Sequence, residues 1–166
     1  MRIFLAGVSC VGKTAIGARL AGLLEFRHLT SHDFRLARSL ALRHVLSREG
    51  SYNCVIALPP SGLWGALWKV VREAGDATTV VLRDAPEKIL GRSTFYDVES
   101  PRCKGISQIK KKHRYLREIK RDITYFNCSF CRADLSVDIC GSSLDDASRR
   151  VWGVLNLARR KKTRQV

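Results

Sequence analysis

Eight residues near the start of the chain have the types and the spacing of a phosphate-binding loop. Residues 7–14 read Gly-Val-Ser-Cys-Val-Gly-Lys-Thr, which fits the pattern G-x-x-x-x-G-K-T without a mismatch. Glycines at the first and sixth positions allow tight turns that bring main-chain N–H groups close to phosphate oxygens. In such loops the lysine contacts the β- and γ-phosphates and the hydroxyl that follows it binds Mg²⁺. The segment therefore predicts a site for ATP and Mg²⁺ formed by Gly7, Val8, Ser9, Cys10, Val11, Gly12, Lys13 and Thr14.

The segments that flank this loop are the ones that the motif requires. Residues 2–6 are a short apolar run typical of a buried strand, and residues 15–24 carry apolar side chains at helical spacing. The start of such a helix adds unpaired N–H groups and the positive end of its dipole. The alternative is a chance glycine-rich turn, and the strand before it, the helix after it and the Lys-Thr pair disfavour that interpretation.

The rest of the chain alternates between the same two patterns. Further strands are expected at 26–30, 53–58, 78–83 and 135–139, and further helices at 34–46, 62–74, 86–92, 107–126 and 144–160. Ser61 is a candidate N-cap for the helix at 62–74, and Ser143 with Asp146 resembles a capping box. The alternation predicts an α/β fold in one domain, residues 1–166: a three-layer sandwich with a five-stranded parallel sheet flanked by helices.

Three segments follow the carboxyl ends of predicted strands. They are the glycine-rich loop, Ser31-His32-Asp33 and Pro59-Pro60-Ser61-Gly62. Ligands of open parallel sheets bind beyond the carboxyl ends of the strands, so we expect one site to use all three.

Charge points to anionic partners. Thirty Lys and Arg against fifteen Asp and Glu give a net charge of +15. For a nucleotide-binding chain these partners are ATP and a small anionic acceptor, with nucleic acid as the alternative. Basic residues gather at 110–114 and in the tail at 159–166, without a nucleic-acid motif or an aromatic stacking platform among them. No apolar run approaches a membrane span, and the immediate entry into a strand leaves no room for a signal peptide, so a cytoplasmic protein is expected.

Cysteines and tryptophans admit a functional and a structural interpretation. Cys128 and Cys131 form a C-x-x-C, but no second close pair accompanies them, so we expect reduced thiols rather than a zinc site. Trp64 and Trp68 stand four residues apart, a spacing that favours packing over base stacking.

The chain resembles the nucleoside-monophosphate-kinase group of P-loop proteins, and shikimate kinases most of all. The resemblance rests on the loop and the small-residue helix with Gly17, the strand at 55–58, and the run from Val80 through Pro86-Glu87 to Arg92. The segment 132–138 is similar to the stretch before the last helix of the family, in the region whose backbone wraps the adenine.

This resemblance implies an ATP-dependent kinase that transfers the γ-phosphoryl group to a hydroxyl or phosphate of a small acceptor. A lid at about residues 93–108 would close over the phosphates, with Arg92 and Arg102 as candidates for the γ-phosphate. Asp33 would lie near Mg²⁺ or the acceptor hydroxyl; alternatively it only stabilises a helix start. The acceptor would lie between the helix after the second strand and the loop after the central strand, with candidates Arg38, Ser61, Gly62 and Arg121 or Arg117. For Arg92 and Arg121 the alternative is a surface charge on a helix.

The chain also departs from shikimate kinases on the acceptor side. Pro59-Pro60-Ser61 and a single Gly62 stand where that family has a glycine triplet. Thr30 and His32 stand where it has two aspartates, and Pro101-Arg102 reverses its Arg-Pro order. Two other functions therefore stay open: a nucleotide-binding module without phosphotransfer, and a nucleic-acid-associated P-loop protein.

Overall fold

The computed structural model of the 166-residue chain describes residues 1–30, 38–47, 52–93 and 107–163. Five strands form one sheet in the order β2-β3-β1-β4-β5, and every neighbouring pair is parallel. The strands are β1 (Arg2–Ala6), β2 (Arg27–Thr30), β3 (Cys54–Ala57), β4 (Ala77–Arg83) and β5 (Leu135–Asp138). The helices are α1 (Lys13–Leu24), α2 (Arg38–Ser47), α3 (Gly65–Glu73), α4 (Pro86–Arg92), α5 (Ser107–Phe130) and α6 (Leu144–Thr163).

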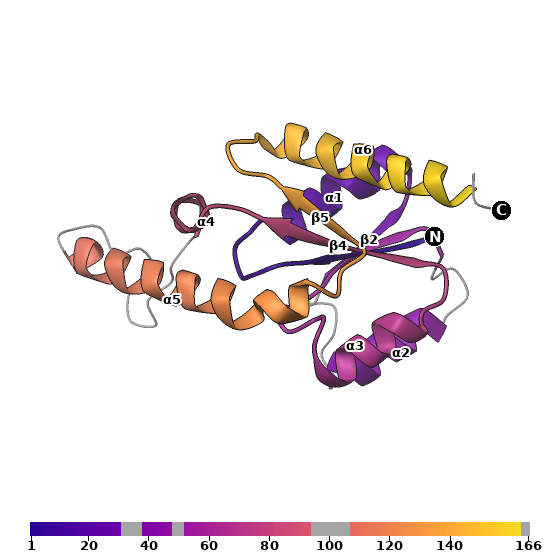
Figure 1. The fold of residues 1–166 in the computed structure, drawn as a ribbon, viewed down its shortest axis with the longest axis horizontal. Coiled ribbons are helices and arrows are strands. Elements are labelled where there is room, and N and C mark those ends of the chain that lie inside the picture. The colour runs from indigo at the N-terminus through magenta and orange to yellow at the C-terminus, as the bar shows by residue number, and fades with distance from the viewer. Residues whose placement is uncertain (31–37, 48–51, 94–106, 164–166) are drawn as a thin grey trace.

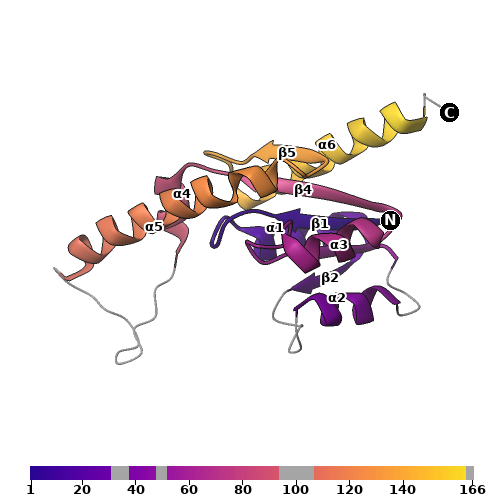
Figure 2. The same ribbon diagram turned by 60° about the horizontal axis from the view of Figure 1, so that its bottom comes forward.

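The helices cover both faces of this sheet. Figures 1 and 2 show α1 and α6 against one face and α2 and α3 against the other. The last turns of α5 lie on the same side as α3, whereas its first turns extend past the sheet beside α4. The arrangement confirms the predicted three-layer α/β sandwich around a five-stranded parallel sheet.

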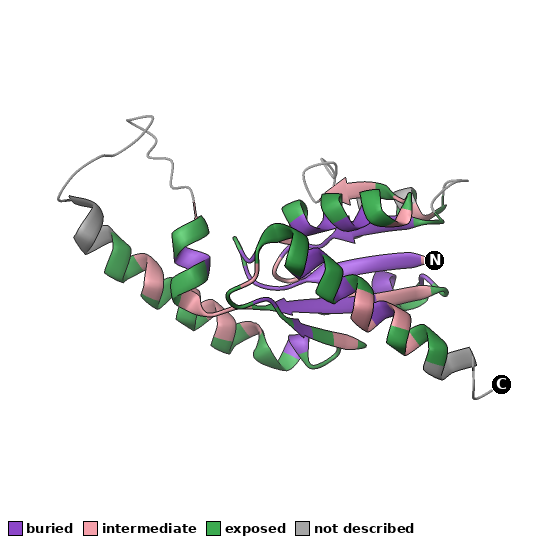
Figure 3. Ribbon diagram, turned by 90° about the horizontal axis from the view of Figure 1, so that it is seen from above, coloured by how far each residue is buried: buried purple, intermediate pink, exposed green. Residues whose placement is uncertain are grey.

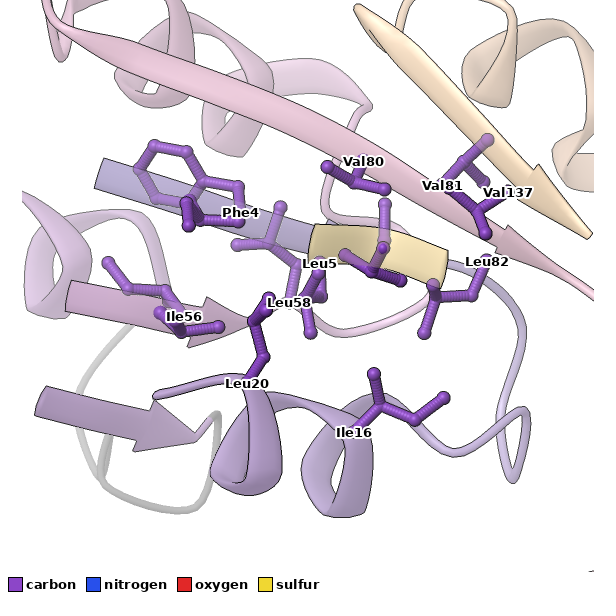
Figure 4. Packing of buried hydrophobic residues seen from close by; sticks show 14 of the residues in the cluster. Phe4, Leu5, Ile16, Leu20, Ile56, Leu58, Val80, Val81, Leu82 and Val137 are labelled. Carbon is purple, nitrogen blue, oxygen red and sulfur yellow. The ribbon is translucent and has the colours of Figure 1, made fainter. Parts of the chain in front are cut away.

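The central strands are apolar on both faces because each face is covered. Every residue of β1 and β3 is buried, as Figure 3 shows along the middle of the sheet. Figure 4 shows how Ile16 and Leu20 of α1 approach Leu5 and Leu58. Continuous apolar runs of this kind are typical of parallel strands between two helical layers. No helix among the described residues is long and apolar enough to cross a membrane.

Several element boundaries differ from those expected from the sequence. The expected helix at 62–74 begins only at Gly65, and Ser61 does not cap it: the main-chain N–H of Trp64 donates to the carbonyl of Ser61 in a turn. The expected helix at 107–126 continues to Phe130. Ser143 caps α6 in a variant of the capping box: the N–H of Asp146 donates to Ser143 Oγ at 3.1 Å, and the Asp146 carboxylate accepts from the Ser143 hydroxyl at 2.6 Å.

Candidate nucleotide site

The loop between β1 and α1 has a backbone that requires glycine. Gly7 has φ 142° and Gly12 has φ 106°, and Cys10 between them also has a positive φ. A Cβ on Gly7 would lie 2.9 Å from the carbonyl oxygen of Leu82 in β4 and 2.9 Å from Val11 Cγ1. The loop is therefore pressed against the end of β4, and its curvature leaves no room for a side chain at its first residue.

Lys13 is held by the loop that precedes it. Its Nζ donates hydrogen bonds to the carbonyl oxygens of Gly7 at 2.9 Å and Val8 at 2.7 Å. Burial lowers the pKa of Lys13 from 10.5 to about 8, and the nearby Cys10 acts weakly in the opposite direction. A partly desolvated ammonium that meets only carbonyl dipoles gains a stronger partner when a phosphate oxygen arrives.

The first turn of α1 has the chemistry that an anion favours. Gly12 at the N-cap makes no side-chain capping bond, and no acidic residue lies in the first turn. Thr14 is exposed there. The orphan N–H groups, the helix dipole and the Thr14 hydroxyl all suit phosphate oxygens.

The residues present fit a magnesium ion that arrives with its nucleotide. Within the described residues no cluster of three His, Cys, Asp or Glu could hold a metal. Mg²⁺ in nucleotide sites keeps several waters and takes phosphate oxygens, so a hydroxyl such as that of Thr14 and a carboxylate suffice from the protein. The predicted carboxylate, Asp33, lies outside the described residues.

Arg92 lies at the same edge of the sheet and is paired with a residue that the sequence analysis missed. Its guanidinium forms an ion pair with the carboxylate of Asp84, whose side chain is fully buried directly after β4. The other carboxylate oxygen of Asp84 accepts the N–H of Ala85 at 2.7 Å. The start of the glycine-rich loop meets Leu82, two residues before Asp84, so the loop and the pair follow the same end of the sheet. The local sequence pattern does not mark this pair, because the contact between Asp84 and Arg92 depends on how α4 folds back toward the end of β4.

The turn after β3 is built by packing. The N–H of Gly62 donates to the carbonyl of Pro59 at 2.8 Å, and a Cβ on Gly62 would lie 2.5 Å from Leu58 Cβ. Gly62 is buried and Ser61 is partly exposed. Their contact with an acceptor stays a prediction.

Within the described residues, the structure does not bring the remaining acceptor-side candidates together. Asp33, Arg102 and the side chain of Arg38 lie outside them, as does most of the predicted lid. Arg117 and Arg121 are exposed on α5. They stand two positions from the core-packed Ile119, so they lie on the opposite face of the helix.

Part of the stretch similar to the adenine-wrapping region is structural. Asp134 Oδ2 accepts the N–H and the hydroxyl of Thr79, both at 2.7 Å, and fixes β5 to β4. By strand register the turn after β5 lies at the edge that carries the glycine-rich loop, since Asp138 is opposite Arg83.

Comparisons with known proteins agree on the fold. No protein-family model and no curated sequence matches the chain. The crystal structure of a shikimate kinase from Bacteroides thetaiotaomicron matches with a TM-score of 0.71 at 16% identity, over 94% of this chain and 98% of that one. A shikimate kinase from Acinetobacter baumannii in complex with shikimate gives 0.68 at 19% identity, over 95% and 93%. A gluconokinase from Sinorhizobium meliloti gives 0.61 at 14% identity, over 99% and 97%. The chain has the fold of P-loop kinases.

Proposed function

We propose that the protein is an ATP-dependent kinase that transfers the γ-phosphoryl group to a hydroxyl or phosphate of a small anionic acceptor. The observation that carries the proposal is Lys13, which is partly desolvated and, among the described residues, bonds to the carbonyls of Gly7 and Val8 in a loop that ends at a helix N-terminus. A cation in this position is poised to exchange two neutral acceptors for phosphate oxygens.

The residues of the chain would act mainly by positioning and by neutralising charge. The loop N–H groups and Lys13 hold the β- and γ-phosphates, and Thr14 with Asp33 would hold Mg²⁺, which when bound neutralises charge on the phosphate oxygens. Asp84 holds the guanidinium of Arg92 after the end of β4, from where it would reach the γ-phosphate, and Arg102 would approach from the lid.

The acceptor side of the proposal rests on position and charge. Asp33 would orient or deprotonate the acceptor hydroxyl, and Arg38, Ser61 and Gly62 would bind the rest of the acceptor. Arg117 and Arg121, the other candidates from the sequence, lie on the exposed face of α5 and are left out of this proposal. Structures with this fold include kinases of shikimate and gluconate, and the net charge of +15 favours a similar anionic acceptor. We place the protein in the cytoplasm, where ATP and such acceptors are found.

One observation supports a second candidate, a nucleotide-binding module without phosphotransfer. The turn after β3 begins with two prolines, and its Gly62 is buried against Leu58. This turn is therefore committed to packing, where a glycine-rich turn would bring main-chain N–H groups to an acceptor.

Turnover of ATP with Mg²⁺ separates the two candidates. We would add shikimate, gluconate and nucleoside monophosphates one at a time to the wild type and to Lys13→Ala. We expect one acceptor to raise turnover well above the basal rate, with the gain abolished in Lys13→Ala. If ATP binds and none of a wide panel of small anions raises turnover, the kinase proposal is wrong and the binding module is supported.

A further inference from the structure

Two exposed aromatic rings that are distant in sequence meet beside a row of arginines. Trp64, just before α3, and Tyr125, on α5, have ring centroids 5.2 Å apart with planes inclined by 48°. Trp64 keeps 44% of its surface exposed and Tyr125 keeps 60%. The sequence analysis expected packing for both tryptophans and no aromatic platform among the basic residues. Trp68 does pack against the core, but Trp64 only partly does.

The pair of rings formed by Trp64 and Tyr125, called here the aromatic platform, is supported by packing and by a hydrogen bond. Trp64 meets Phe126 edge-on with centroids 6.3 Å apart, and Phe126 in turn contacts the buried Phe130. Nη1 of Arg132, just past α5, donates to the carbonyl oxygen of Leu63 at 3.1 Å and ties the turn that carries Trp64 to the end of that helix. A stacking surface fixed before binding loses little conformational freedom when a flat ligand arrives.

A row of cations leads along α5 to this platform. Arg117, Arg121 and Tyr125 follow one another at intervals of four residues, so they share one face of the helix over about 12 Å. All three are exposed. Neighbouring cations are engaged: Arg114 pairs with Glu118 at 3.1 Å and Lys120 with Glu87 of α4 at 3.2 Å. Among the described residues no ion pair is found for Arg117 or Arg121, so their charges are available to a ligand.

We propose that this face, formed by Arg117, Arg121, Tyr125 and Trp64, binds single-stranded nucleic acid. Arginines spaced along a helix suit successive phosphates, and aromatic rings at the end of the row suit unpaired bases, whose faces stack without regard to sequence. The net charge of +15 adds long-range attraction for such a polyanion.

Fluorescence anisotropy with labelled oligo-U and oligo-dT of about 15 nucleotides tests the proposal, since such a length covers one site. ATP with Mg²⁺ is kept in excess so that phosphates of the oligonucleotide do not enter the glycine-rich loop. We expect either single strand to bind in the presence of ATP and more tightly than a duplex of the same length, although the duplex has the higher charge density. If the single strands bind only when ATP is left out, or if the duplex binds as tightly as they do, the proposal is wrong.

Matched variants separate stacking from total charge. Tyr125→Ala should weaken single-strand binding by about five- to a hundredfold, whereas Tyr125→Phe retains the ring and should bind nearly as well as the wild type. Arg117→Ala with Arg121→Ala should reduce the slope of log affinity against log salt by about 1.4. The control pair Arg149→Ala with Arg160→Ala removes the same charge from exposed positions on α6, which covers the other face of the sheet.

The control pair should change the salt slope much less than the α5 pair. Equal changes from both pairs, or unaltered binding in Tyr125→Ala, would show that only net charge attracts the strand and would contradict the proposed site. Lys13→Ala should bind the oligonucleotides normally, so a failure of the kinase proposal leaves this one standing.

Discussion

Arg2 is buried and Lys13 is partly buried, and the two cations stand near opposite ends of β1. Arg2 is 8% exposed. Its guanidinium donates to the carbonyls of Ala74 and Leu46, and its central carbon lies 4.4 Å above the ring of Tyr52. These partners come from three segments of the chain. Within the part of the chain that the structure describes, Lys13 instead bonds to two carbonyls of its own loop.

The difference separates a structural cation from one that is available for a ligand. Arg2 cannot leave without unpairing groups at the ends of α2 and α3, so it joins elements at the amino edge of the sheet. Lys13 can leave its two carbonyl partners without separating any two elements of the fold, because both belong to the loop that precedes it. Desolvation of a cation costs free energy, which groups from several elements offset for Arg2. For Lys13 a phosphate oxygen of the proposed nucleotide site would do so.

Substitution of Gly7 should cause the largest loss of ATP affinity at the edge of the sheet that carries the glycine-rich loop. Gly7→Ala places a Cβ 2.9 Å from Leu82 O in a backbone at φ 142°, so the loop must move. We expect the ATP affinity to fall by at least about a hundredfold, because the displaced N–H groups no longer converge on phosphate. Gly65→Ala is the matched control: its φ is 57° and no atom lies within 4 Å of the added Cβ. Calorimetric titration of the control should give wild-type affinity, and comparable losses in both variants would contradict this explanation.

Substitution of Arg2 should destabilise the fold at the opposite, amino edge of the sheet. Arg2→Met removes two hydrogen bonds and the contact with Tyr52, so we expect the free energy of unfolding to decrease by about 2–4 kcal/mol. Urea denaturation measures it. The folded fraction should bind ATP within about twofold of the wild type, because Arg2 acts on stability alone. A large loss of ATP affinity without a loss of stability would reverse the assignment of the two cations.

Variants of the Asp84–Arg92 pair test whether a second cation on the loop side of the sheet acts on ATP or only on stability. If Arg92 reaches the γ-phosphate, Arg92→Ala should lower kcat/KM for ATP by about tenfold, a typical value for a charged hydrogen bond. Asp84→Asn should raise KM by a smaller factor, because it loosens the guanidinium without removing it. Steady-state kinetics and thermal unfolding of both variants are compared. Equal losses of stability with an unaltered KM would make the pair purely structural.

The protonation of Lys13 should have the smallest of these effects, a dependence of the ATP affinity on pH. Its pKa of about 8 rises when a phosphate binds beside it, so ATP binding takes up protons near that pH. The affinity should therefore stay level at lower pH and decrease as the pH rises through 8 and above. Titrations at about pH 8 in two buffers of different ionisation enthalpy measure the uptake. Lys13→Met should lack this contribution, and an identical uptake in that variant would assign the proton to another group.

Local patterns predicted the sheet, the order of elements and the glycine-rich loop, because each depends on residues close together in the chain. The extension of α5 to Phe130 was missed, since Asn127 and Cys128 favour the end of a helix and only the packing of Phe130 against the core carries it further. Ser61 has the right residue type for an N-cap, but the turn that Gly62 makes against Leu58 delays the helix.

Contacts between distant segments could not be predicted from such patterns. Asp84 looks like an ordinary residue of a strand-to-helix turn, and only the fold shows that its buried carboxylate pairs with Arg92. Trp64 and Tyr125 are 61 positions apart (125 − 64), and their meeting depends on how α5 crosses below the sheet. The loop was predictable because its chemistry lies in eight consecutive residues, whereas the proposed strand-binding face exists only in the folded chain.

Calorimetric titration with ATP and Mg²⁺ of the wild type, Lys13→Met and Arg2→Met tests the central claim most directly. We predict that the wild type and Arg2→Met bind ATP with similar affinity, and that Lys13→Met binds at least about tenfold more weakly although it folds normally. Binding of ATP by Lys13→Met with wild-type affinity would contradict the assignment of Lys13 as the phosphate-binding cation, and with it the proposed nucleotide site.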